Sequence, residues 1–154
     1  MSLGFTIIEL LVVVAIIAVL ASIVLINVNA IRAKAADAKT KAQMAALRPA
    51  AATYYDSNAN NYGPATAAAA NCTTGGMGLD TASGFANLVL AASYSNAVAP
   101  TCSTDSTVAN VATRWSAWHT LQATAGTAFC VDSTGQGKVE PSGWTPPTTG
   151  ASCP

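Results

Sequence analysis

The chain has 154 residues, enough for one modest domain and an anchor, and charged residues make up only 9% of it, against roughly 25% in ordinary globular proteins. The formal net charge is zero, which removes any general electrostatic attraction to nucleic acid or to anionic surfaces. The charges are unevenly placed, because five of the seven basic residues fall within residues 32–48.

The chain opens with an apolar segment. Between residues 5 and 31 the only ionisable side chain is Glu9, and between residues 10 and 26 the only polar side chain is Ser22. At about 1.5 Å per residue, a helix of this length crosses a bilayer core of about 30 Å. An ordinary membrane anchor and a secretory signal cut after Ala21 are two interpretations. The signal is disfavoured, because the run is long and residues 1–3 contain no Lys or Arg.

Glu9 calls for a third interpretation. A lone carboxylate at membrane depth costs about 2.5–3.5 kcal/mol on insertion scales. Near the start of a helix the dipole favours negative charge and the headgroups are within reach, which is one explanation. The other is a partner cation. Since the segment has no basic side chain, that cation would come from elsewhere, and the free α-amino group of a neighbouring chain is one candidate.

Residues 4–17, GFTIIELLVVVAII, resemble the N-terminal signature of type IV pilins and the related pseudopilins: a glycine, then Phe-Thr-x-x-Glu, then a long apolar helix. The resemblance implies that a prepilin peptidase cuts after Gly4 and that the new N-terminal residue, Phe5, is N-methylated. It also implies that Glu9 pairs with the α-amino group of Phe5 on an adjacent subunit during assembly. The resemblance is strong in the N-terminal third of the chain and extends to the remainder only in layout.

The leader departs from the family pattern, because residues 1–3 lack the basic residue that usually precedes the glycine. By the positive-inside rule, the basic cluster in residues 32–48 would then favour the cytoplasm, whereas a pilin domain lies outside. The motif and the cysteines favour the outside. We therefore expect the N-terminus inside and the domain outside the cytoplasmic membrane before assembly, and the domain on the cell surface afterwards.

The helix is expected to continue beyond the membrane, since residues 31–47 are rich in strong helix formers. Asp37 and Lys41 are spaced for an i,i+4 ion pair, and Pro49 is expected to kink or locally break the helix. The basic run is either a solvated surface or a contact with anionic headgroups or with an acidic patch on a neighbour. One small apolar face recurs at helical spacing and consists of Ile31, Ala35, Ala38, Ala42, Ala45 and Ala46.

Residues 56–110 are predicted to be a turn-rich loop with one short helix near residues 84–93. Asn71-Cys72-Thr73 matches the glycosylation sequon, and we interpret it as a turn around a cysteine. Further along the chain the pattern changes to β. The segments expected as strands are residues 114–121, with Trp115, Ala117, His119 and Leu121 on one face, and residues 128–132 and 137–140, paired across a turn.

The four cysteines are widely spaced and include no C-x-x-C pair, so neither a zinc site nor a redox motif is indicated. An even number of scattered cysteines after an apolar N-terminal segment favours two disulfides in an oxidising compartment over four free thiols. Three pairings are possible. Many pilins have a disulfide-bounded C-terminal loop, so the resemblance implies a Cys130–Cys153 bond around the proline-rich tail, with Cys72–Cys102 then stapling the middle region.

Nothing in the sequence indicates catalysis. The run Asp132-Ser133-Thr134-Gly135 has one residue more than the aspartic protease triplet and no second copy, so we expect a turn. His119 is the only histidine, and without a nucleophile motif we interpret it as a half-buried structural residue. Some pseudopilins bind calcium, for which Asp132 and Glu140 are the available acids, but no acidic loop is present. We expect no enzyme activity, no cofactor and no specific nucleic acid.

The sequence therefore predicts an α+β fold in which a long N-terminal helix packs on a small antiparallel sheet with a disulfide-bounded C-terminal loop. The expected parts are a leader (residues 1–4), a membrane-spanning assembly helix (5–28), its amphipathic continuation (29–55) and an extracytoplasmic domain (56–154). The predicted function is that of a subunit of a homo-oligomeric type IV pilus, which lies in the lipid bilayer before the assembly machinery extracts it. The alternatives are a pseudopilin of a type II secretion or DNA-uptake system and, more remotely, a monomeric secreted or anchored protein.

Overall fold

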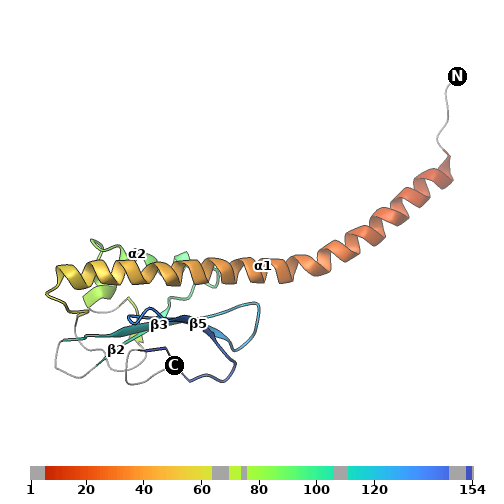
Figure 1. Ribbon diagram of the computed structural model, residues 1–154. Helices are drawn as coiled ribbons and strands as arrows, with labels where there is room; N and C mark the ends of the chain where they lie inside the picture. The colour runs from red at the N-terminus through yellow and green to blue at the C-terminus, as the bar shows by residue number, and fades with distance from the viewer. Residues whose placement is uncertain (1–5, 64–69, 74–75, 106–110, 146–151, 154) are drawn as a thin grey trace.

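The computed structural model describes residues 6–63, 70–73, 76–105, 111–145 and 152–153. Its main feature is one long helix, α1 (Ile7–Ser57), of 51 residues. The N-terminal half of α1 projects away from the rest of the chain, and its C-terminal half lies along one face of a β-sheet (Figure 1). The α+β fold predicted from the sequence is therefore confirmed.

Helix α1 passes through Pro49 without interruption, so no break occurs there. Proline lacks an N–H and removes the helical donor of the Ala45 carbonyl. Both residues lie on the exposed side of the helix, where water can replace the missing donor. The helix ends two residues beyond the expected position, and its last turn is closed by Asn58, whose N–H and side-chain amide donate to the carbonyls of Tyr55 (3.2 Å) and Tyr54 (2.9 Å).

The sheet has five antiparallel strands in the order β1-β2-β3-β4-β5. Strands β3 (Trp115–Thr120), β4 (Ala128–Asp132) and β5 (Gly137–Glu140) lie where the sequence predicts them, and β4 pairs with β5 across the expected turn. Strands β1 (Ala70–Asn71) and β2 (Thr101–Thr104) fall in the segment predicted to be loop, and that prediction is wrong there. These strands are short and lack an apolar alternation, so pairing with β3 specifies β2 rather than a local pattern.

Three short helical turns precede β2. They are η1 (Gly76–Leu79), α2 (Phe85–Leu88) and η2 (Ala91–Ser93). The single helix expected over residues 84–93 is thus split. Gly84 enters α2 with a φ of 81°, and Leu90 is extended between the two turns, so neither turn propagates.

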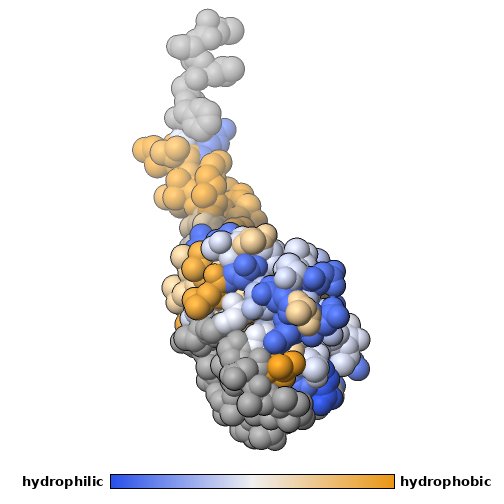
Figure 2. All heavy atoms as spheres, turned by 90° about the vertical axis from the view of Figure 1, so that its left-hand side faces the viewer, coloured by the Kyte–Doolittle hydropathy of each residue, from blue (hydrophilic) through white to orange (hydrophobic). Residues whose placement is uncertain are grey.

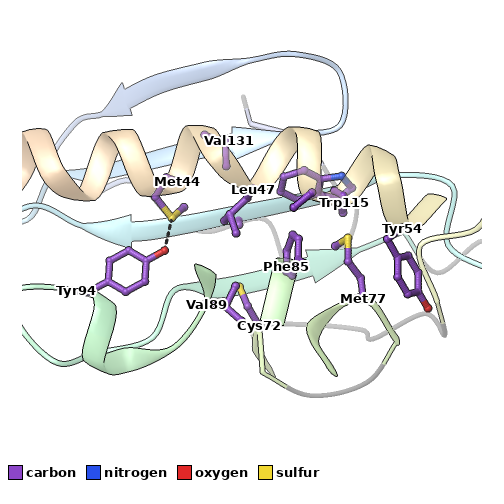
Figure 3. Packing of buried hydrophobic residues seen from close by; sticks show 13 residues of the cluster. Met44, Leu47, Tyr54, Cys72, Met77, Phe85, Val89, Tyr94, Trp115 and Val131 are labelled. Carbon is purple, nitrogen blue, oxygen red and sulfur yellow. Dashed lines mark hydrogen bonds between the residues drawn. The ribbon is translucent and has the colours of Figure 1, made fainter. Parts of the chain in front are cut away.

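The core lies between α1 and the sheet (Figure 3). Met44 and Leu47 of α1 are fully buried there. They face Trp115 of β3 and Val131 of β4, and the Phe85 ring packs edge-on against Trp115 at 5.9 Å. On the other face of the sheet, a second cluster is formed by Trp118, Cys130 and Cys153, with Trp144 packed against it. Strand β3 therefore alternates as predicted and is buried on both faces.

Hydrogen bonds between Asp105, just after β2, and residues 113–114, just before β3, hold these two ends of the connection together. Asp105 is buried and its carboxylate accepts hydrogen bonds from the N–H (2.7 Å) and hydroxyl (2.6 Å) of Thr113 and from the N–H (2.8 Å) of Arg114. The Arg114 guanidinium lies 3.5 Å away. Burial alone would raise the pKa of Asp105, but these hydrogen bonds outweigh it and hold the pKa below its ordinary value of 3.8.

Candidate assembly site

The N-terminal half of α1 is an exposed apolar surface. Every residue from 7 to 24 is exposed, including Ile7 at 82% and Leu11 at 67%. Figure 2 shows this surface as a nearly uniform hydrophobic column behind the domain. A soluble monomer rarely exposes so much contiguous apolar surface. Within the described residues, α1 is the one helix long and apolar enough to cross a membrane, judged by length and composition.

Ser22, the one hydroxyl in the middle of this column, needs no partner outside its own helix. Its hydroxyl lies 2.6 Å from the Ala18 carbonyl oxygen and 3.1 Å from that of Val19. A serine bonded to the preceding turn hides its polar group from hydrocarbon. Ser22 is therefore compatible with lipid or with a neighbouring helix.

The helix begins with a capping box built by Thr6 and Glu9. Thr6 is the N-cap, with extended backbone, and its hydroxyl accepts a hydrogen bond from the Glu9 N–H at 3.3 Å. The Glu9 carboxylate accepts in return from the Thr6 N–H at 2.9 Å and from the Thr6 hydroxyl at 2.7 Å. The sequence interpretation missed Thr6 as the helix cap and as the hydrogen-bond partner of Glu9, although Thr-x-x-Glu before an apolar run is the usual sign of such a cap.

Glu9 therefore has hydrogen-bond partners within its own chain, but neither Thr6 group that donates to its carboxylate carries a positive charge. A capping box provides hydrogen bonds at the start of a helix, but it places no positive charge beside the carboxylate. Among the described residues, no cation lies in an ion pair with Glu9. Gly4 and Phe5, the predicted processing residues, lie outside the described residues. The site thus presents a capped carboxylate that can still receive a cation.

The C-terminal half of α1 is fixed to the domain by polar contacts at two loops. Asp37 is buried, and its carboxylate accepts hydrogen bonds from the N–H groups of Gln122 (2.6 Å) and Ala123 (3.0 Å). The predicted ion pair between Asp37 and Lys41 is therefore wrong. Near the end of the helix, the Arg48 guanidinium donates to the Gln136 carbonyl. The helix thus carries the domain as an attached unit.

The structure contains two disulfides, Cys72–Cys102 and Cys130–Cys153, which are the pairs that the resemblance implies. The first joins the middle region to β2. The second returns the tail to β4, and Cys153 is buried against Trp118. Both bonds lie in the domain, outside the apolar column.

Asp132 has a structural role. Its carboxylate accepts hydrogen bonds from the N–H groups of Thr134 (2.9 Å), Gln136 (3.0 Å) and Cys153 (2.8 Å), and from the Thr134 hydroxyl. The expected turn after β4 is therefore present. Glu140 is buried 3.6 Å from the Lys138 ammonium. Within the described part of the chain, no three His, Cys, Asp or Glu side chains come together as metal ligands.

His119 is fully buried rather than half-buried, which corrects the sequence interpretation. Its ring stacks on Tyr94 at 4.5 Å, and its two nitrogens lie 2.7 Å and 3.0 Å from the carbonyl oxygens of Thr120 and Val98. Burial raises the pKa of Tyr94 to about 12, so this phenol stays protonated beside the Met44 sulfur. These contacts pin the loop before β2 onto β3.

Comparison with protein families agrees with this geometry. Residues 1–25 match the family described as the prokaryotic N-terminal methylation motif. This motif is the signature of type IV pilins and pseudopilins, so the resemblance found in residues 4–17 is confirmed. The signature marks a class of structural subunits and implies a prepilin peptidase substrate that assembles into filaments. No curated protein and no solved structure matches the chain.

Proposed function

We propose that this protein is a structural subunit of a type IV pilus. In this proposal the chain is cut after Gly4, Phe5 is N-methylated, and the apolar column of α1 first lies in the membrane and then packs against the same column of neighbouring subunits. A head-to-tail contact of this kind generates an open helical polymer. The observation that carries the proposal is the capped, uncompensated Glu9 at the exposed end of that column.

The proposed partner of Glu9 is the α-amino group of Phe5 on an adjacent subunit. In the membrane-anchored monomer, the helix dipole and the two Thr6 donors offset part of the carboxylate's desolvation cost. Deeper in an apolar filament that cost rises, and an ammonium partner compensates for it at low dielectric. The capping box keeps the acid oriented, and the neighbour supplies the opposite charge.

Two substitutions at Glu9 separate capping from charge pairing. Glu9→Gln keeps a side chain that completes a capping box but removes the charge, and Glu9→Ala removes both. We expect both variants to enter the membrane and neither to form filaments, as measured by membrane fractionation and electron microscopy of sheared surface fibres. Thr6→Ala, which keeps the charge and loses the cap, is expected to retain assembly. Normal fibres from Glu9→Gln would refute the pairing.

The processing steps have a direct test. The intact mass of protein purified from its native membrane or filaments should correspond to a chain that begins at Phe5 and carries one added methyl group. A chain that begins at Ser22 would mean an ordinary secreted protein and would overturn the proposal. Long surface fibres by electron microscopy would distinguish a pilus from the short fibre of a pseudopilin. The C-terminal disulfide loop supports the pilus.

A further inference from the structure

The charges of the folded chain are not balanced at its surface. All seven acidic and all seven basic side chains lie among the described residues. Four of the acids are buried in the domain and its helix contacts: Asp37, Asp105, Asp132 and Glu140. Two of these, Asp37 and Asp132, accept hydrogen bonds from backbone N–H groups and, among the described residues, form no ion pair. The neutral sequence therefore folds into a molecule whose exposed charge is mainly positive.

The excess is concentrated at one place, immediately after the apolar column. Arg32, Lys34 and Lys39 are exposed and Lys41 is half-buried. Among the described residues, the ion pairs are Arg114–Asp105 and Lys138–Glu140, so none of these four cations has an acidic partner. The acid nearest in sequence, Asp37, turns toward the loop after β3 instead. We call Arg32, Lys34, Lys39 and Lys41 the basic collar.

The collar has a defined arrangement around the helix. Residues seven apart are about 20° apart around the axis, so Arg32 lies above Lys39 on one side and Lys34 above Lys41 on the other. Residues two apart are about 200° apart, so the two pairs flank a strip between them. That strip is exposed and apolar, with Ile31 at 63% exposure, and it continues the apolar column. The domain covers the opposite side.

The position of the collar along the chain matches the lipid headgroups. The apolar run from residue 7 to residue 26 is about 29 Å long at 1.5 Å per residue, close to a bilayer core of about 30 Å. Arg32 and Lys34 follow within about two turns of its end, so their long side chains reach the headgroups on the domain's side of the membrane. Lys39 and Lys41 lie about two turns, or about 10 Å, further along the axis and add longer-range attraction to the same anionic surface.

We propose that the basic collar binds the phosphates of anionic phospholipids in the leaflet on the domain's side while the subunit lies in the membrane. This inference rests on the membrane-anchored state of the proposed function. An acidic patch on a second copy is disfavoured, because the acids outside the buried set are Glu9, Asp56 and Asp80. Glu9 lies at the far end of the column, and Asp80 already accepts from the Ser83 N–H at 2.7 Å. The membrane surface supplies the missing negative charge.

The test uses the full chain in nanodiscs that contain equal amounts of phosphatidylglycerol and phosphatidylcholine. Native mass spectrometry then counts which phospholipids stay bound. A basic residue at an anionic surface contributes about a five-fold gain in binding, so we expect at least a five-fold preference for phosphatidylglycerol. Replacing the whole collar with glutamine should bring the ratio to about one. The charge-conserving swap Arg32→Lys/Lys34→Arg should keep the preference, and Lys138→Gln, which removes a cation from β5, should leave it unchanged.

Each outcome decides the question. No preference in the unaltered chain, or a preference that survives the glutamine variant, would overturn the inference. If the collar variant loses binding to duplex DNA while its lipid ratio is unaltered, the surface belongs to nucleic acid, which also overturns it. The measurement needs no filament, so its failure leaves assembly untouched. A chain absent from the nanodisc fraction would instead contradict the membrane-anchored state itself.

Discussion

The contact of Asp37 with the loop after β3 gives the sharpest stability prediction. Asp37→Ala removes an acceptor that holds the N–H groups of Gln122 and Ala123 at 2.6 Å and 3.0 Å. Hydrogen bonds to charged groups contribute about 1.5–3 kcal/mol each. Because Gln122 and Ala123 are exposed, water can reach their freed N–H groups, and the low end of that range applies. We therefore expect the free energy of unfolding to fall by about 2–3 kcal/mol.

Guanidinium unfolding of the detergent-solubilised full chain measures this loss, since the three tryptophans lie in the domain. Asp56→Ala is the matched control, because Asp56 is an exposed acid on the same helix and should cost no more than about 0.5 kcal/mol. Asp37→Asn keeps one acceptor oxygen and should lose about half as much as Asp37→Ala. If Asp37→Ala unfolds within about 0.5 kcal/mol of the unaltered chain, the carboxylate does not hold the helix to the loop.

Three further changes test the domain. Leu47→Ala should cost about 2–5 kcal/mol in the same unfolding assay, because Leu47 is fully buried, whereas Leu90→Ala, at 50% exposure, should cost under about 1 kcal/mol. The lowered pKa of Asp105 means that its stabilisation is complete above the ordinary value and is lost as pH falls through the folded value. The difference in free energy of unfolding between the unaltered chain and Asp105→Asn should thus be constant near neutral pH and shrink in acid. A difference that grows in acid would contradict the lowered pKa of Asp105. Cys130→Ser/Cys153→Ser opens a link between residues 23 apart and should cost about 3 kcal/mol; an unchanged unfolding midpoint would show that the tail is held by other contacts.

The parts of the fold that were predictable from the sequence are those with a local signal. The order-fixed motif at residues 4–17 and the alternation along β3 each express one physical constraint within a few residues. Strands β4 and β5 were predictable for the same reason, since a short turn joins them. Thr6 also has a local signal, which only the capping-box spacing reveals.

The rest of the fold depends on contacts between distant residues. Strand β2 is too short to show a pattern and exists because β3 pairs with it. The i,i+4 spacing predicted an ion pair between Asp37 and Lys41, but the partners of Asp37 are backbone N–H groups 85 and 86 residues away. A buried carboxylate with two N–H donors is better satisfied than an exposed pair, which contributes only a few tenths of a kcal/mol. No spacing rule within the helix contains that information.

Helix α1 is continuous, but its two halves lie in different environments. Residues 7–24 are all exposed, whereas the C-terminal half buries one side against the domain and leaves the small apolar strip uncovered. Two polar contacts fix the domain to that helix, so a subunit that leaves the membrane carries its domain with it. Under the proposed function, the lipid contacts of the basic collar must break at that step, while the contact between Glu9 and a neighbour's amine forms at the other end of the column. On extraction, neighbouring helices take the place of the lipid tails, and the buried ion pair at Glu9 takes the place of the contacts with headgroup phosphates. Assembly should therefore be most sensitive to charge changes at the two ends of the column. It should be least sensitive to apolar substitutions of equal volume within the column.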